Sequence, residues 1–158
     1  MIDAETQNQK GSERGLQRNI MLLADDSEDD IAILKEVFSK QKFLRIVDVA
    51  HDGEEALVCL RKMVNQGKKP PDLVILDINM PRKNGFEVLE ELKNDPKLKQ
   101  IPVIMLTCSE RQEDINRAYQ MGAAAYFTKP MTLETYFGLA QALDQYWGRY
   151  AKMPSISI

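Results

Sequence analysis

The fold of this chain is decided by the stretch Leu73-Val-Ile-Leu-Asp77-Ile-Asn79-Met-Pro81. Four consecutive apolar residues that are followed at once by a carboxylate are typical of a short strand covered on both faces. Such strands occur in parallel sheets, where a crossover helix links each strand to the next. The stretch therefore predicts a buried parallel strand with an acidic side chain at its carboxyl end.

Working outward from this strand, four more short apolar runs are separated by helical patterns. In the first of these patterns, Ile31, Leu34, Val37 and Phe38 form one apolar stripe. Strict alternation of strands and helices implies right-handed crossovers and a doubly wound sheet. We therefore predict an α/β fold of the (βα)₅ type, with five parallel strands in the order 2-1-3-4-5. The predicted strands are residues 20–24, 45–50, 73–76, 103–106 and 124–127.

Polar residues mark where several of the helices begin and end. Ser27 is a good N-cap for the first helix, and Thr132 is one for the last. Gly122 stands where the residue after a helix C-terminus belongs. Asp29 and Asp30 complement the amino end of the first helix, and we assign them to that role alone.

Composition narrows the class of protein. The chain has 158 residues, 44% hydrophobic and 28% charged, which suits one globular domain. A net charge of −3 argues against sequence-independent nucleic-acid binding, so no DNA partner is expected. The apolar runs are too short to span a bilayer, and the polar first residues are not a secretory signal. Two cysteines make no disulfide framework, so we expect a cytoplasmic protein without membrane association.

The two ends of the chain differ in composition from the middle. Residues 1–19 lack apolar periodicity and are predicted to be a flexible N-terminal tail. Residues 151–158 contain Pro154 and two serines and are predicted to be a C-terminal tail. The globular domain is then expected at residues 20–150.

Chemically active residues follow the ends of the predicted strands. Asp25 and Asp26 follow the first strand, Asp77 the third, Thr107 the fourth and Lys129 the fifth. Because the carboxyl ends of parallel strands meet at one edge, near the switch in strand order, we expect these residues to lie together.

The first and third strands are neighbours in the predicted order, so three carboxylates would lie close and repel one another without a cation. Mg²⁺ prefers oxygen ligands of this kind and keeps positions open for water and phosphate. An acidic metal site with an ammonium and a hydroxyl suits a phosphoryl group. A carboxylate such as Asp77 can be the acceptor of that group.

Residues 19–150 resemble a response-regulator receiver domain, the acceptor half of bacterial two-component signalling, with a flavodoxin-like fold. The resemblance is specific because all its motifs occur in order at the expected strand ends. The motifs are Leu-Leu-Ala-Asp25-Asp26-Ser27, Leu-Val-Ile-Leu-Asp77-Ile-Asn79-Met-Pro81, Asn84-Gly85, Val103-Ile-Met-Leu-Thr107 and Gly122-Ala-Ala-Ala-Tyr-Phe-Thr-Lys129-Pro130.

The resemblance implies that Asp77 is phosphorylated. It further implies that Asp26, Asp77 and the backbone carbonyl of Asn79 bind Mg²⁺, with Mn²⁺ as a substitute. Asp25 would act largely through a metal-bound water.

The resemblance also assigns the residues around the phosphoryl group. Thr107 and Lys129 would hold phosphoryl oxygens, and Tyr126 would be an aromatic switch that follows Thr107 inward. The family pattern further implies a cis peptide bond between Lys129 and Pro130, which would turn the lysine toward the phosphate.

A finer resemblance is to the standalone regulators that partner bacterial phytochrome kinases. It rests on the Lys68-Lys-Pro-Pro71 loop, on Asp95-Pro96 with Ile101-Pro102, and on Tyr146-Trp147 followed by Met153-Pro154. It implies a histidine kinase or phosphotransfer protein of the phytochrome type as the phosphoryl donor, with the chromophore in the kinase.

Aromatic residues gather in the last third of the chain. One amphipathic helix and a short strand cannot bury them all, so an exposed aromatic face is a candidate interface, against simple core packing. Because two-fold dimers are the commonest homo-oligomers, we predict a homodimer through residues 110–150. The rival is a monomer that keeps this face for a kinase or a downstream protein. The residues are Tyr119, Tyr136, Tyr146, Trp147 and Tyr150.

Three functions compete at this stage. The leading one is a phosphorylation-controlled switch of protein partners, which is a signalling phosphoacceptor and not an enzyme acting on a substrate. The second is an aspartyl-nucleophile phosphatase, but those enzymes carry a second aspartate where this chain has Asn79. The third is a phosphate-independent scaffold, against which the intact set of Asp26, Asp77, Thr107 and Lys129 argues.

Overall fold

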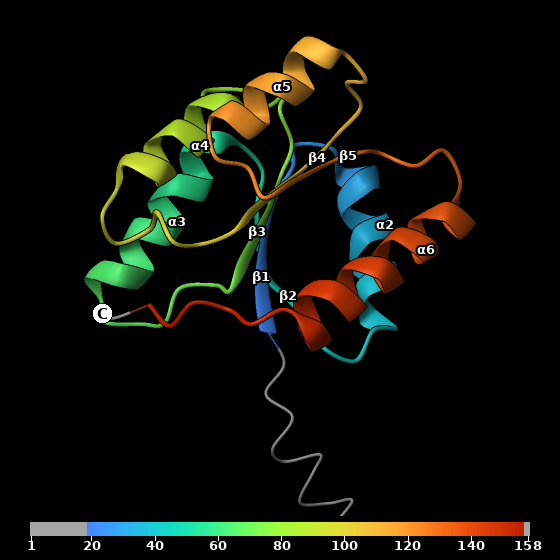
Figure 1. Ribbon diagram of the computed structural model, residues 1–158, viewed down its shortest axis with the longest axis horizontal. Coiled ribbons are helices and arrows are strands. Elements are labelled where there is room, and N and C mark those ends of the chain that lie inside the picture. The colour runs from blue at the N-terminus through green and yellow to red at the C-terminus, as the bar shows by residue number, and fades with distance from the viewer. Residues whose placement is uncertain (1–18, 157–158) are drawn as a thin grey trace, which may run out of the picture.

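A five-stranded parallel sheet lies between two layers of helices in the computed structural model, which describes residues 19–156 (Figure 1). The strand order is β2-β1-β3-β4-β5 and every neighbouring pair is parallel, so the predicted fold class and order are confirmed. Each predicted strand is found, with ends that differ by no more than one residue. The strands are β1 (Asn19–Ala24), β2 (Leu44–Ala50), β3 (Leu73–Leu76), β4 (Val103–Thr107) and β5 (Ala125–Thr128).

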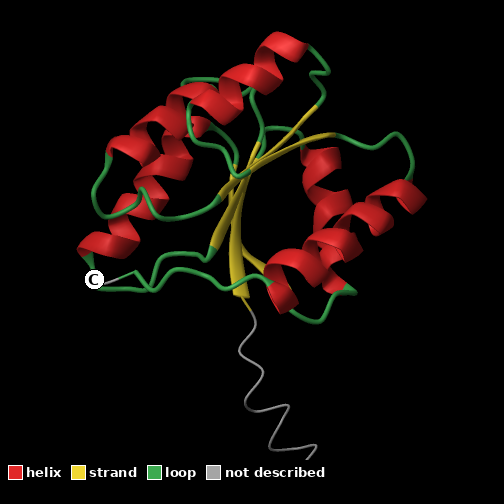
Figure 2. Ribbon diagram, viewed as in Figure 1, coloured by secondary structure: helices red, strands yellow, loops and turns green. Residues whose placement is uncertain are grey.

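Helices connect the strands and cover both faces of the sheet (Figure 2). Helices α2 and α6 share one face, while α3, α4 and α5 cover the other (Figure 1). The helices are α2 (Glu28–Ser39), α3 (Gly53–Asn65), α4 (Gly85–Asn94), α5 (Gln112–Gln120) and α6 (Leu133–Leu143), followed by the π-helix η1 (Asp144–Tyr150).

The predicted helix ends are found in the structure. The Ser27 side chain accepts a hydrogen bond from the Asp30 N–H at the start of α2, and Thr132 caps α6 in the same way. After α5, Gly122 has a φ of +101°, a left-handed conformation that glycine adopts without steric cost. These local signals fix where each helix starts and stops relative to the strand ends.

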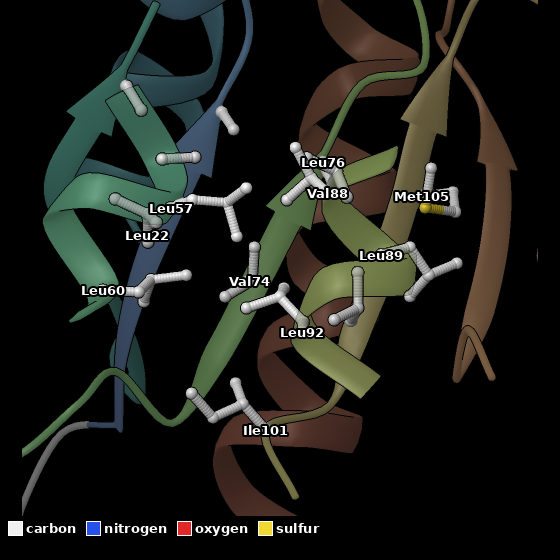
Figure 3. Packing of buried hydrophobic residues seen from close by; sticks show 14 of the residues in the cluster. Leu22, Leu57, Leu60, Val74, Leu76, Val88, Leu89, Leu92, Ile101 and Met105 are labelled. Carbon is white, nitrogen blue, oxygen red and sulfur yellow. The ribbon is translucent and has the colours of Figure 1, made fainter. Parts of the chain in front are cut away.

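Two hydrophobic cores lie on opposite faces of the sheet, because successive residues of a strand point to opposite sides. Leu22 and Val74 belong to the core under α3 and α4, which Figure 3 shows, and Leu23 and Ile75 belong to the core under α2 and α6. All of β3 is buried, as its unbroken apolar run predicted. Full burial of one such side chain stabilises the fold by about 1.5–3 kcal/mol. The cores thus hold the strand ends in fixed relative positions.

The last helix changes from an α-helix to a π-helix at Asp144, where α6 ends and η1 begins. This carboxylate is only 2% exposed, and its Oδ1 accepts hydrogen bonds from the Phe43 and Leu44 N–H groups at 2.9 and 2.7 Å. It therefore fastens the start of the edge strand β2 to the end of the last helix.

We expect Asp144→Ala to destabilise the protein by about 2 kcal/mol or more, because it leaves two backbone donors without their acceptor. Urea denaturation measures the loss. Asp144→Asn is the matched control, since its amide oxygen can still accept these bonds, and it should lose less. Equal stability of Asp144→Ala and the wild type would contradict the role given to this side chain.

The segment after η1 lies along the amino edge of the sheet (Figure 1). Met153 packs against the core under α2 and α6, and Ile156 packs against the opposite core. Residues 1–18 and 157–158 of the predicted tails lie outside the described residues, and Asn19 begins β1. The domain boundaries therefore stay a prediction. Within residues 19–156 no helix combines the length and apolar character needed to cross a membrane.

Candidate functional site

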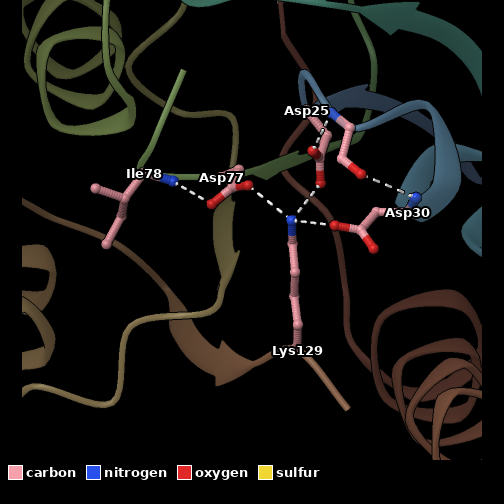
Figure 4. Close-up of polar contacts among 6 residues, drawn as sticks. Asp25, Asp30, Asp77, Ile78 and Lys129 are labelled. Atoms are coloured by element: carbon pink, nitrogen blue, oxygen red, sulfur yellow. Dashed lines mark hydrogen bonds and ion pairs between the residues drawn. The ribbon is translucent and has the colours of Figure 1, made fainter. Parts of the chain in front are cut away.

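An ammonium group surrounded by carboxylates occupies the carboxyl edge of the sheet (Figure 4). Asp25 follows β1, Asp77 follows β3 and Lys129 follows β5, as the strand ends predicted. The Lys129 Nζ lies 2.9 Å from Asp25 Oδ2, 2.7 Å from Asp77 Oδ2 and 2.7 Å from Asp30 Oδ2. Residues far apart in the sequence therefore form one charged cluster.

Asp30 is a correction to the sequence analysis, which assigned it to the helix end alone. Side chains on a helix point back toward its amino end, so a carboxylate in the first turn of α2 reaches the sheet edge. The Asp30 N–H donates to the Ser27 Oγ at 3.3 Å, while the Asp30 carboxylate accepts a hydrogen bond from the Lys129 Nζ at 2.7 Å. Asp29, its neighbour in the sequence, is exposed.

Three carboxylates form a group that could hold a metal ion. Asp25, Asp26 and Asp77 each offer an oxygen atom, and these atoms lie within 4.8 Å of one another. Asp25 and Asp77 are buried, whereas Asp26 is exposed. Oxygen donors of this kind fit a hard divalent cation. Asn79 lies on the loop between β3 and α4 with an exposed side chain, two residues beyond Asp77.

Burial and hydrogen bonding shift the pKa values of these charged groups in opposite directions. Burial raises the pKa of Asp25, although hydrogen bonds from the Ser27 N–H and from Lys129 oppose it. Burial alone would lower the pKa of Lys129, but hydrogen bonds to Asp30, Asp77 and Asp25 outweigh it and raise that pKa. Lys129 is therefore charged at neutral pH and partly compensates the carboxylates.

We expect Asp25→Asn to raise the melting temperature of the metal-free protein at neutral pH. Because burial raises the pKa of Asp25, the folded state binds the carboxyl proton more tightly than the unfolded state does. The stabilisation from this proton is complete below the unfolded pKa of 3.8 and is lost as pH rises through the folded pKa. The neutral amide avoids that loss. Melting curves in a chelator, at neutral and at acid pH, measure the difference, which should vanish in acid. A less stable Asp25→Asn variant at neutral pH would contradict the argument.

Thr107 and Tyr126 lie on neighbouring strands beside the charged cluster. Thr107 is fully buried, and its hydroxyl is the one buried side-chain polar atom in residues 19–156 without a hydrogen-bond partner. Such a group calls for an explanation, because an unpaired buried polar atom is costly. The Tyr126 hydroxyl donates to the Ser109 carbonyl at 2.8 Å, which holds the ring against the loop between β4 and α5.

The expected cis bond between Lys129 and Pro130 is wrong for this structure, because every peptide bond of the described residues is trans. The trans form is the favoured one even before proline. Here the Lys129 ammonium already reaches three carboxylates with this bond trans, so its direction does not depend on a cis geometry.

The loop that carries Asp77 is anchored by a contact that sequence analysis missed. Arg82 binds Asp52 through its Nε at 2.8 Å and its Nη2 at 2.6 Å. Asp52 is also the N-cap of α3, and its hydrogen bond to Arg82 helps to lower its pKa. The pair ties the β3–α4 loop to the start of α3, the helix that precedes β3 in the chain. Nothing in the local sequence signals it, since the two residues are 30 positions apart.

Comparisons with known proteins identify relatives that share this fold. The response regulator Rcp1 of Synechocystis sp. is 32% identical over 137 residues, which is 86% of this chain and 93% of the relative. The solved structure of the phosphorylated cyanobacterial phytochrome response regulator RcpA matches with 33% identity and a TM-score of 0.80, over 88% of this chain and 100% of that one. The Mn²⁺-bound form of Rcp1 matches with 30% identity and a TM-score of 0.75, over 87% and 99%.

A family model gives the assignment directly. The model described as the response regulator receiver domain matches residues 21–140, which is most of the chain. The fold and the strand order are those that the sequence analysis predicted. This chain belongs to the response regulator receiver domain family.

Proposed function

We propose that the chain accepts a phosphoryl group on Asp77 from a histidine kinase and thereby changes its protein partners. The observation that carries the proposal is the position of Asp77, buried at the end of β3 with its Oδ2 on the Lys129 ammonium. Its Oδ1 accepts the Ile78 N–H at 2.7 Å, so the carboxylate is held in place. A carboxylate oxygen forms the new P–O bond while the P–N bond to the donor histidine breaks.

The oxygen-only donor set supports Mg²⁺ as the natural ion, with Mn²⁺ as a substitute. Asp26, Asp77 and the Asn79 carbonyl would hold it, and Asp25 would act through a bound water. When bound, the ion supplies positive charge that offsets the charge of the phosphoryl oxygens. The Mn²⁺-bound form of the relative Rcp1 supports a divalent ion.

The chain's own side chains complete the phosphoryl site. Lys129 supplies a second positive charge, and the unpaired Thr107 hydroxyl would donate to a phosphoryl oxygen, which accounts for its lack of a partner in the described structure. Tyr126 would leave the Ser109 carbonyl and move toward the space that Thr107 vacates. The surface over α5, β5 and α6 would change with it, and so would the preferred partner.

The partner we propose is a histidine kinase or phosphotransfer protein of the phytochrome type. The support is the likeness to RcpA, which is a cyanobacterial phytochrome response regulator. The domain would meet this kinase in the cytoplasm.

The aromatic residues near the end of the chain support a homodimer through residues 110–150. Tyr119, Tyr146 and Tyr150 are 50%, 60% and 67% exposed, whereas Tyr136 is buried in the core. Trp147 is half-buried and packs edge to face against the Tyr146 ring, with 4.8 Å between the ring centroids. Three of the aromatic side chains thus remain available for a partner.

We expect Tyr146→Ala to weaken this dimer, and phosphorylation to change its association by about 1–3 kcal/mol, a typical coupling between two sites. Sedimentation at several concentrations, with and without phosphorylation, measures both effects. The control is Val58→Ala, an equally exposed apolar residue on α3 outside the proposed interface. A single monomeric species in both states would defeat the dimer proposal.

The test of the function is phosphorylation by acetyl phosphate with Mg²⁺, followed by mass measurement of the intact protein. One phosphoryl group should be added, and Asp77→Asn should add none. Full phosphorylation of this variant would overturn the assignment of Asp77. Steady release of phosphate from small phosphate esters would favour the phosphatase, and partner binding indifferent to phosphorylation would favour the scaffold.

A further inference from the structure

The Lys129 ammonium has an acceptor that lies outside the proposed metal group. Asp25 and Asp77 belong to the group of three carboxylates, whereas Asp30 does not. Asp30 nevertheless holds the ammonium at 2.7 Å, the same distance as Asp77. Its side chain is 25% exposed, against 2% and 7% for Asp25 and Asp77 in the same contacts.

Several negatively charged groups therefore compete for the single ammonium of Lys129. A divalent ion held by Asp26 and Asp77, with Asp25 reached through a bound water, would compensate those carboxylates, but it leaves Asp30 with Lys129 as its partner. A phosphoryl group on Asp77 carries close to two negative charges and needs the same ammonium. Because Nζ has three protons in a tetrahedral array, each contact kept with Asp30 is one that the phosphoryl oxygens lack.

We propose that Asp30 is a positioning residue that holds Lys129 back from the phosphoryl group and thereby limits how strongly the phosphorylated state is stabilised. The proposal rests on the proposed function and adds a control to it. Asp30 acts through Lys129 and touches neither the phosphoryl group nor the metal ligands.

The probe is beryllium fluoride, which binds to an aspartate carboxylate as a mimic of the phosphoryl group, with saturating Mg²⁺. Asp30→Asn keeps the shape of the side chain and removes its charge, so Lys129 is free for the mimic. The apparent dissociation constant should fall about threefold to fivefold, the range expected from one partly exposed ion pair. Asp30→Glu keeps the charge and should stay near the wild-type value.

The matched control is Asp29→Asn, which removes the same charge from the same turn of α2 at an exposed position without the contact to Lys129. It should leave the dissociation constant unchanged. Asp30→Asn should also have no effect in a Lys129→Ala background, since its action passes through the ammonium. An equal gain in Asp29→Asn, or a gain that persists without Lys129, would overturn the proposal in favour of general electrostatics.

A readout without metal tests the contact itself. In a chelator, the change in melting temperature caused by Asp30→Asn should be present with Lys129 and absent in the Lys129→Ala background. An equal change in both backgrounds would overturn the pairing. The outcomes separate the two proposals, because a wild type that neither binds the mimic nor is phosphorylated defeats the function. A wild type that binds it with the same affinity as Asp30→Asn defeats only the role of Asp30.

Discussion

Removal of Mg²⁺ should lower the rate at which Asp77 is phosphorylated by about a hundredfold or more, the scale on which preorganised charge acts in transition states. The incoming phosphoryl donor is anionic, and it meets carboxylate oxygens that lie within 4.8 Å of one another. The single ammonium of Lys129 cannot offset them all. Initial rates with acetyl phosphate, in Mg²⁺ and in a chelator, measure the effect.

Asp26→Ala should reproduce most of this loss, because Asp26 is a proposed ligand of the ion. Asp26 is exposed and makes no ion pair with Lys129, so the contacts of the ammonium should stay intact in this variant. Mg²⁺ should raise the melting temperature of the wild type through linkage, and Asp26→Ala should lose most of that rise. Asp29→Ala, an exposed carboxylate nearby on α2, serves as the control and should keep it. A full response to Mg²⁺ in Asp26→Ala would place the ion elsewhere.

Gly85→Ala should destabilise the protein by about 3 kcal/mol, the upper range for forcing an added methyl group into packed structure. A Cβ at this position would overlap the carbonyl oxygen of Asp77 and come within 2.8 Å of the Ile78 Cα. The Gly85 N–H also donates to the Ile78 carbonyl at 2.7 Å, so the two segments are held together. Relief of the clash requires a shift of the phosphoacceptor backbone, and phosphorylation should slow as well.

Urea denaturation and the acetyl phosphate assay measure these two losses. The control is Gly138→Ala on α6, where an added Cβ meets nothing within 4 Å. A glycine in an exposed helix costs about 0.5–1 kcal/mol relative to alanine, so this variant should be slightly more stable than the wild type. Wild-type stability in Gly85→Ala would mean that the β3–α4 loop is free to move, against the packing described above.

The fold could be predicted because its signals are local. The buried run of β3 and the helix caps at Ser27 and Thr132 each depend on a few neighbouring residues. The contact of Asp144 with the start of β2 could not be predicted, because its two partners lie about a hundred residues earlier in the chain. A polar residue at that spacing otherwise suggests only the solvent side of a helix.

The site likewise contains residues that the sequence pattern predicts and one, Asp30, whose role depends on a distant contact. Asp25, Asp77 and Lys129 were predictable because a parallel sheet brings its strand ends together, whatever the loops do. Asp30 was missed because a carboxylate in a first helical turn has a sufficient local explanation in the helix dipole. Its contact with Lys129 spans 99 positions and forms only when the end of β5 lies beside the first turn of α2.

The arrangement of the segment after η1 has a practical consequence for biosensor design. Asn19 starts β1, and residues 153–156 line a hollow with Lys69, Pro70 and Asp72, while Asp72 in turn binds the Ile20 N–H. Both ends of the described chain therefore leave from the amino edge of the sheet (Figure 1), opposite the carboxyl ends of the strands, where Asp77 follows β3. A fluorescent protein or an immobilising tether fused directly before Asn19 or directly after Ile156 should leave the edge that holds Asp77 accessible to a soluble kinase.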